Sequence, residues 1–301
     1  MPRLLPFCLT ALLLLPGTVV CGRDFLFAGY NIENYAPVVV EGATKSGRPL
    51  KSARSAEAVA QVVRELSPDI LGVCEMGAKV QFEEFRARME ASGMGYVDAE
   101  WVDGPDPDRH LALFSRFPIV ARQSATDLPI AESREIRQKV HRGFLDVTVE
   151  PAPGFQMRIV GVHLKSKLPT PEGSADVQRR QEAHLLRRYV EAILSANPET
   201  NLLVFGDFND TKGQPALQEI TGTRGTACAL AELRLADAVG DRWTHYWKAE
   251  DLYSRIDYLF VSRALAPAVV SKDSGVYRTP NWNQASDHRP VFATFHPPAN
   301  P

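Results

Sequence analysis

Short apolar runs in this 301-residue chain end repeatedly in Asn, Glu, His or Asp. Runs of this length and composition are typical of buried strands. In layered α/β folds, the strand ends and the loops beyond them are where a functional site is assembled. The polar residues that close these runs are Asn31, Glu75, His163 and Asp207. We therefore expect a single site built from residues that lie far apart in the sequence.

Two kinds of strand pattern alternate with amphipathic helical patterns. Phe144–Val149 alternates with the strand period, whereas Ile70–Cys74 is continuously apolar. Helical spacing covers Ser55–Leu66, with Ser55 as the expected N-cap, and a longer helix is expected over Asp176–Leu194. Asp287–Phe292 opens the last expected strand. The mixture predicts an α/β (α+β) fold, a four-layer α/β/β/α sandwich of two packed mixed sheets.

The N-terminus has the features of a signal peptide. Arg3 precedes the apolar run Leu4–Leu15, and a small-residue site follows. The run is too short to cross a bilayer of about 30 Å. We expect residues 1–22 to be removed, which leaves one domain over residues 23–301. The chain is then exported, periplasmic or secreted, as a monomer without a stable membrane span. A retained anchor, or a lipid attached to Cys21, is the alternative.

The formal net charge of −2 is not that of a protein held on DNA by many phosphate contacts. The substrate is therefore either small or gripped locally by a basic mouth. Cations in loops near the strand ends can form such a mouth, and the alternative is a scattered solvated surface. These cations are Lys45, Arg48, Lys51, Arg54, Arg134, Arg137, Lys139, Arg142, Lys165 and Lys167.

Two cysteines remain after residue 22. Cys74 sits inside an apolar run and is expected to be a small buried side chain. Export would permit a disulfide with Cys228. The sequence leaves this pairing open.

Asp207 and Asn209 follow an apolar strand. In an extended chain, positions i and i+2 point to the same side, so the two side chains are expected to share a face. An aspartate can orient or deprotonate a water, and an asparagine amide can hold a water or a phosphate oxygen. The alternative is an ordinary Asx turn after a strand.

Asn31 and Glu75 each close a buried strand. Mg²⁺ takes oxygen ligands and keeps several waters, so one or two protein carboxylates suffice to hold it. A buried glutamate without a partner is costly, so a balancing charge is expected beside Glu75. A salt bridge or a helix N-terminus is the alternative partner.

Two histidines lie at strand ends. His163 follows an apolar strand, and His288 follows Asp287. A histidine titrates near neutral pH and can donate or accept a proton. Asp257 lies in a strongly apolar strand and must find a hydrogen-bond donor. A histidine ring N–H is an apt donor that would fix the tautomer of the ring, whereas Arg255 or a backbone amide is the alternative.

Together, these residues fall into seven short blocks that resemble, in order, the signature blocks of the endonuclease/exonuclease/phosphatase superfamily. The match extends from about Tyr30 to Phe295. The blocks are Tyr30–Asn34, Pro68–Glu75, Ser115–Ile119, His163–Ser166, Gly206–Asn209, Arg255–Tyr258 and Ser286–Pro290.

The resemblance implies a metal-dependent phosphoesterase with Mg²⁺ as cofactor and Mn²⁺ as the alternative. It implies roles for eight residues and a ninth by a looser match. The implied metal ligands are Glu75, Asn31 and Asp287; the implied catalytic residues are Asp207, Asn209, Asp257, His288 and the deoxyribonuclease-type His163; and the implied substrate-binding residues are Arg142 and Asn209.

The superfamily fixes the reaction type and leaves the substrate open. We expect a phosphate ester, with nucleic acid favoured. A lipid or small-molecule phosphatase or phosphodiesterase is the alternative, and a lipid enzyme would expose an aromatic loop such as Trp243–Trp247 or Trp282. The alternative that is not an enzyme is a catalytically inactive binding module on the same fold.

Overall fold

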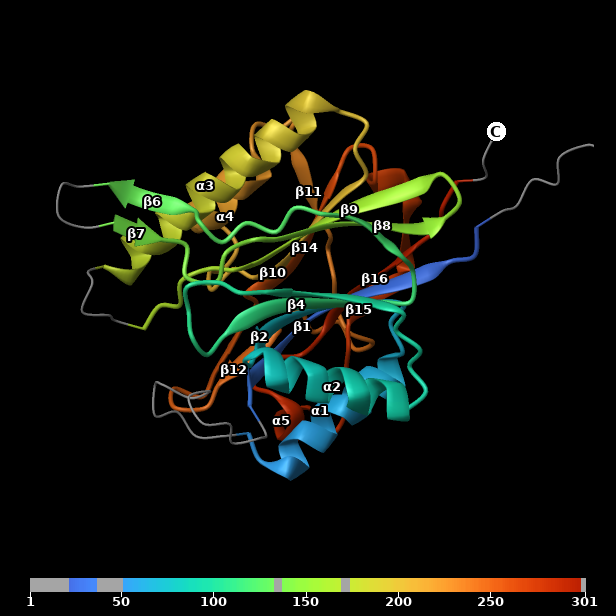
Figure 1. Cartoon of the computed structure of the whole chain (residues 1–301). Coiled ribbons are helices and arrows are strands. Elements are labelled where there is room, and N and C mark those ends of the chain that lie inside the picture. Colours follow the sequence, from blue (N-terminus) through green and yellow to red (C-terminus); the bar gives the residue numbers. More distant parts are fainter. Residues whose placement is uncertain (1–21, 37–50, 133–136, 169–173, 299–301) are drawn as a thin grey trace, which may run out of the picture.

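A computed structural model describes residues 22–36, 51–132, 137–168 and 174–298. Two six-stranded mixed sheets form its centre (Figure 1). In spatial order, the first sheet contains β15 (Val269–Val276), β16 (Val291–Phe295), β1 (Phe25–Tyr35), β2 (Ile70–Met76), β4 (His110–Ser115) and β3 (Asp98–Val102). The second contains β11 (Leu230–Glu232), β14 (Asp257–Ser262), β10 (Leu202–Asp207), β9 (Phe155–His163), β8 (Leu145–Ala152) and β5 (Ile119–Arg122).

Helices cover the outer face of each sheet (Figure 1). Helices α1 (Ala53–Leu66) and α2 (Lys79–Ala91) pack on the first sheet, and α3 (Ala175–Ala196) and α4 (Pro215–Thr221) pack on the second. A third apolar layer fills the space between the sheets. The predicted four-layer α/β/β/α sandwich is therefore confirmed. The remaining elements are the hairpins β6 (Pro129–Glu132)/β7 (Arg137–Lys139) and β12 (His245–Trp247)/β13 (Leu252–Ser254), α5 (Trp282–Ala285) and the 3₁₀ turn Ala266–Ala268.

The two sheets approach closely around one phenylalanine. Phe205 of β10 is fully buried between them. A Cβ added at Gly72 would lie 2.3 Å from its ring, and one added at Gly161 would lie 2.6 Å from it. The glycines therefore let the backbones of β2 and β9 lie against the aromatic ring.

Helix α1 begins earlier than predicted. Its N-cap is Ser52, whose side chain accepts a hydrogen bond from the backbone N–H of Ser55. The expectation that Ser55 caps the helix is therefore wrong, because Ser55 lies inside the first turn. Ser67, in a left-handed conformation, ends the helix before Pro68.

The last strand begins later than predicted, at Val291. The preceding segment pairs with hairpin β12/β13 instead. The backbone N–H of Tyr246 donates to the carbonyl of Asp287 at 2.9 Å, and that of Arg289 donates to the carbonyl of Thr244 at 2.7 Å. These bonds hold Asp287 and the residue after it beside the hairpin, outside the sheet.

Strands β1 and β2 are irregular where they reach the edge of the sheet. The pairing of β2 with β4 shifts register between Val73 and Met76, and Glu75 has φ +63°. Strand β1 continues past Asn31 to Tyr35 through a similar irregularity. Glu75 thus lies inside its strand instead of following it. A bulge of this kind re-aims a side chain, and bulges are common next to active sites.

Several predictions lie outside the described residues. These are the predicted signal peptide, residues 1–22, of which only Gly22 is described, and the cations Lys45, Arg48 and Arg134. Among the described residues, no helix combines the length and hydropathy of a transmembrane span. Cys74 is buried between the sheets as predicted, and both Cys74 and Cys228 are free thiols.

Candidate active site

Sheet register brings the predicted residues to one edge of the sandwich. Asp207 at the end of β10 is paired with His163 of β9 and with Asp257 of β14. On the first sheet, Asn31 of β1 lies opposite Cys74, next to Glu75. Strand ends from both sheets therefore contribute to the same small region, as the sequence predicted.

Asn31 connects the two sheets. Its side-chain Nδ2 donates to Oδ2 of Asp207 at 3.1 Å and lies 3.4 Å from Oε1 of Glu75. Its Oδ1 accepts the backbone N–H of Glu33 at 3.0 Å. Because every polar atom of the amide is engaged, the orientation of this buried side chain is fixed.

Glu75 lies among donors and other charged groups. Its Oε2 accepts the backbone N–H of Asn34 at 2.8 Å and lies 3.4 Å from Nε of Arg109. Its Oε1 lies 3.8 Å from Nε2 of His163. Burial, and the negative charge of Asp287, raise the pKa of the Glu75 carboxyl above its usual value. Arg109 is therefore the positive charge expected beside Glu75, but it does not cancel the cost of burying the carboxylate.

Asp207 is the central carboxylate of the site. Its Oδ2 lies 3.6 Å from Nε2 of His163 and 3.7 Å from Nε2 of His288, and Oδ1 accepts the backbone N–H of Asn209 at 2.8 Å. Burial, followed by the charge of Asp257, raises the pKa of Asp207 to about 7. Such a shift is typical of functional carboxylates.

His288 and Asp257 form the predicted pair. Nδ1 of His288 donates to Oδ2 of Asp257 at 2.8 Å, so Nε2 faces Asp207. Burial on its own lowers the pKa of the imidazole, but the charge and hydrogen bond of Asp257 outweigh it and hold the pKa well above the usual value. The backbone N–H groups of Asp257 and Ile256 both donate to Thr244 Oγ1, which fixes the start of β14.

Asn209 lies in the site with a geometry that differs from the prediction. Its φ is +50°, so the chain is not extended there and the simple same-face argument does not apply. An Asx turn from Asp207 holds its backbone, and its side-chain Nδ2 donates to the carbonyl of Leu164 at 3.0 Å. Asn209 is thus locked beside Asp207 by a turn.

Arg142, the loosest of the predicted site residues, is buried and pairs with Asp106 at 3.1 Å. Its positive charge opposes the rise in the pKa of Glu75. The positive charge of the Arg142 guanidinium therefore stabilises the ionised form of Glu75.

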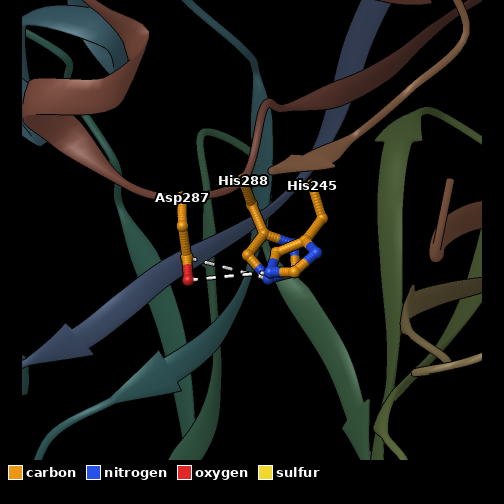
Figure 2. Close-up of side chains that lie close together, drawn as sticks. All are labelled: His245, Asp287 and His288. Carbon is orange, nitrogen blue, oxygen red and sulfur yellow. Dashed lines mark ion pairs between the residues drawn. The ribbon is translucent and has the colours of Figure 1, made fainter. Parts of the chain in front are cut away.

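Asp287 is placed with two imidazoles, one of which the sequence did not single out (Figure 2). Its Oδ1 lies 3.8 Å from Nε2 of His288, and its Oδ2 lies 3.7 Å from Nε2 of His245. Burial on its own raises the pKa of Asp287, but the hydrogen bond of His245 and the positive charges of His288 and His245 together lower it below its usual value. The sequence-based prediction uses only the aromatic rings of Trp243–Trp247 and gives His245 no role. The feature that points to His245 is its alternation with two tryptophans, shortly before the Asp257 block.

Arg109 and Glu33 were also missed. Arg109 donates to Oδ1 of Asn34 at 2.9 Å besides approaching Glu75. Glu33 forms an ion pair with buried Lys51 at 3.5 Å. Arg109 lies in a loop and Glu33 in the irregular end of β1, and neither follows a sequence periodicity that could place it.

The described cations of the predicted basic mouth are engaged by protein groups. The pairs are Lys51 with Glu33, Arg54 with Gln284, Lys139 with Asp127, Arg142 with Asp106, Lys165 with the backbone carbonyl of Leu168, and Lys167 with Asp210. The side chain of Arg137 lies outside the described residues. Part of the positive charge of these side chains is therefore neutralised within the protein.

The sequence profile of the Endonuclease/Exonuclease/phosphatase family matches residues 28–288, and the chain belongs to this family. Enzymes of the family hydrolyse phosphate-ester bonds. The resemblance seen in the seven blocks is thus confirmed. Comparison with curated protein sequences gives no match.

Solved structures show the same fold at low identity. An endonuclease/exonuclease/phosphatase from Bacteroides vulgatus has a TM-score of 0.63 at 19% identity, covering 91% of this chain and 99% of that one. The human Nocturnin catalytic domain has a TM-score of 0.61 at 20% identity, covering 90% and 94%. Sphingomyelinase C from Streptomyces griseocarneus has a TM-score of 0.61 at 15% identity, covering 91% and 100%.

Proposed function

We propose that the chain is a Mg²⁺-dependent phosphoesterase that cuts a P–O bond at the edge where the two sheets meet. The observation that carries the proposal is the contact chain from Asp257 through His288 and Asp207 to Asn31 and Glu75. It joins a histidine–carboxylate pair to a cluster of oxygen-bearing side chains. These groups together can activate a water molecule for attack on a phosphate and hold a metal ion beside it.

The residues of the pocket fit a magnesium ion. Asp207 is buried and the Glu75 side chain is 13% exposed, and the pKa values of both carboxyls are raised, so the protein's own cations leave part of their charge unbalanced. Carboxylate and amide oxygens are the ligands that Mg²⁺ prefers. Glu75 would hold the ion, with Asp287 as a further predicted ligand. Asn31 would contribute Oδ1, the atom that accepts the backbone N–H of Glu33. When bound, Mg²⁺ neutralises charge that builds up on the phosphate oxygens.

The proton chemistry belongs to the histidines and Asp207. Asp257 holds His288 with Nε2 toward Asp207, and a water between these two groups would be oriented for in-line attack. His163, 3.6 Å from the same oxygen of Asp207, is placed to donate a hydrogen bond to a phosphate oxygen or to the leaving group. Asn209 supports this arrangement by fixing the turn after Asp207.

Hydrolysis of bis-p-nitrophenyl phosphate tests the proposal. We expect activity that needs Mg²⁺ and is abolished by EDTA. His288→Ala should lower kcat by about 100-fold or more, the range for loss of a general acid or base. His184→Ala is the matched control because His184 is an exposed histidine on α3 that pairs with Glu219. Activity that survives in His288→Ala would refute the catalytic assignment, and an inert wild-type protein would favour the binding-module reading.

Nucleic acid is the substrate class that we favour. Trp247 is two residues after His245 on strand β12, so both side chains lie on the same face of the hairpin. The Trp247 side chain is exposed. An exposed aromatic ring beside a phosphate site can stack on a base, and each stacked base contributes about 1–3 kcal/mol. Such stacking would supply binding energy that the basic side chains near the site, already paired with protein groups, do not provide.

A lipid phosphodiester is the second candidate, because Leu252 and Tyr253 are exposed on the partner strand β13. In contrast, Trp243 and Trp282 pack against each other with ring centroids 5.0 Å apart. A panel of single-stranded DNA, RNA, plasmid DNA, sphingomyelin vesicles and inositol phosphates separates the classes. If Trp247 stacks on bases, Trp247→Ala should raise KM for oligonucleotides. If the hairpin binds lipid, Leu252→Asp should weaken vesicle binding.

Export is part of the same proposal and rests on residues 1–22. We expect the mature protein to begin at residue 23 and to be recovered outside the cytoplasm. Mass spectrometry of the intact protein from a secreting host measures its first residue. An uncleaved, cytoplasmic chain would contradict the proposal.

A further inference from the structure

The side chains of His245, Asp287 and His288 lie close together (Figure 2). Their ligand atoms all lie within 4.8 Å of one another. His245 comes from hairpin strand β12 and the other two from the loop before β16, and a backbone bridge between His245 and His288 fixes their spacing. Residues from two elements are therefore held in a compact N,N,O arrangement.

In each imidazole, Nδ1 contacts an oxygen atom of the protein. Nδ1 of His288 is bonded to Asp257 at 2.8 Å, and Nδ1 of His245 lies 3.3 Å from Oγ of Ser254. Both Nε2 atoms consequently face Asp287. Metal-binding histidines nearly always have this arrangement, in which a carboxylate or another oxygen orients the ring and fixes its tautomer.

The spacing suits a tetrahedral ion. Bonds of about 2.0–2.2 Å to nitrogen and oxygen place neighbouring ligand atoms about 3.4 Å apart. The observed separations from Asp287 to the imidazole nitrogens are 3.7 and 3.8 Å. The two imidazole nitrogens lie within 4.8 Å of each other, so a contraction of at most about 1.4 Å would bring the three ligands onto one ion. Access is open because the Asp287 side chain is 42% exposed, which leaves the fourth position to water.

We propose that His245, Asp287 and His288 form a second cation site, which binds a divalent transition metal such as Zn²⁺. Two imidazoles and one carboxylate suit Zn²⁺, Co²⁺ or Ni²⁺, whereas Mg²⁺ favours oxygen ligands. The site thus differs in chemistry from the Mg²⁺ site at Asn31 and Glu75, with which it shares the predicted ligand Asp287.

Occupation of this site has a consequence that rests on the proposed function. A metal on Nε2 of His288 removes the nitrogen that would orient the attacking water. We therefore expect Zn²⁺ to inhibit Mg²⁺-dependent hydrolysis, and His245→Gln to weaken that inhibition. Binding itself is measured without activity, so the two proposals fail separately.

The test is a titration of the metal-free protein with Zn²⁺ by calorimetry and with Co²⁺ by visible absorption. Co²⁺ bound by imidazoles with four ligands absorbs visible light far more strongly than Co²⁺ in an octahedral oxygen site. We expect one such site in the wild type. His245→Gln should weaken Zn²⁺ binding by about 100-fold or more and abolish the strong absorption, and Ser254→Ala should weaken binding by about 10-fold.

Two variants make the result specific. His184→Gln, which removes an exposed histidine of α3, should bind Zn²⁺ as the wild type does. Glu75→Gln, which alters the oxygen-rich pocket, should keep the Co²⁺ absorption. Circular dichroism and thermal melts of the metal-free variants show that each is folded. The inference is overturned if folded His245→Gln and Ser254→Ala both bind Zn²⁺ like the wild type, or if Glu75→Gln alone loses the Co²⁺ signal.

Discussion

At the scale of single residues, burial sets the chemistry of the site. Glu75 and Asp207 are carboxylates that water barely reaches, and burial raises the pKa of both. A proton on Asp207, whose pKa is about 7, removes a negative charge beside the proposed metal site and so competes with the ion near neutral pH. The same burial makes each of them costly unless a cation is close.

The first prediction concerns this competition. The pKa of Asp207 is about 7, so its carboxyl is mostly protonated at pH 6 and mostly ionised at pH 8. We expect Mg²⁺ to bind about tenfold more weakly at pH 6 than at pH 8. Calorimetric titration at the two pH values measures the difference. Asp207→Asn should remove most of it, and equal affinities in the wild type would contradict the prediction.

A second prediction tests the metal anchor. Glu75→Gln keeps the shape of the side chain and removes its charge, so the ion loses its main ligand. We expect hydrolysis to fall by about 100-fold or more and the stabilisation of the fold by Mg²⁺ to disappear. Glu83→Gln, at an exposed position of α2 that pairs with Lys79, is the control. Thermal melts with and without Mg²⁺ provide the second readout.

Most site residues could be predicted from the sequence because each follows an apolar run of residues. Asn31, Glu75, His163 and Asp207 are of this kind. His245 could not be found this way, because it lies in a three-residue strand and acquires its role only from contact with a distant loop.

At the scale of elements, the long apolar strands and helices were predictable and the short ones were not. Strands β3, β5 and β11 have five residues or fewer and carry polar or half-exposed side chains. Their pairing partners specify them more than their own composition does. Capping was misplaced at α1 because Ser52 and Ser55 both suit an N-cap, and only the backbone geometry distinguishes them.

The packing of the two sheets around Phe205 gives a third prediction. A methyl group at Gly72 would overlap the buried ring, so the backbone or the ring must move. We expect Gly72→Ala to lower the free energy of unfolding by about 1–3 kcal/mol. Urea denaturation measures the change. Phe205→Leu in the same chain should recover part of the loss, and a Gly72→Ala protein as stable as the wild type would show that the sheets can separate freely.

At the scale of the whole molecule, one buried carboxyl makes stability depend on pH. Glu182 of α3 is fully buried and accepts the backbone N–H of Lys165 at 2.6 Å. Burial raises its pKa from 4.5 to about 7. Between these values the folded chain holds a proton that the unfolded chain releases. Stability from this group therefore falls as the pH rises from about 4.5 to 7.

The fourth prediction follows from that sign. Glu182→Gln keeps an acceptor and cannot ionise, so it should stabilise the protein at pH 8 by up to about 3 kcal/mol. The gain should vanish near pH 4.5, where both side chains are neutral. Denaturation curves at the two pH values measure it, with the exposed Glu90→Gln as control. A gain of equal size at both pH values would rule out ionisation as the cause.

The hydrogen bond between Asn31 and Asp207 joins one sheet to the other across the interior. Neither half of the sandwich alone holds both the metal anchor and the histidine–carboxylate pair. Partly folded forms that keep only one sheet would therefore be inert, and recovery of hydrolysis during refolding would report the moment at which the halves dock. A chain that crosses a membrane before folding would carry no phosphate-cutting activity on the side where it is made.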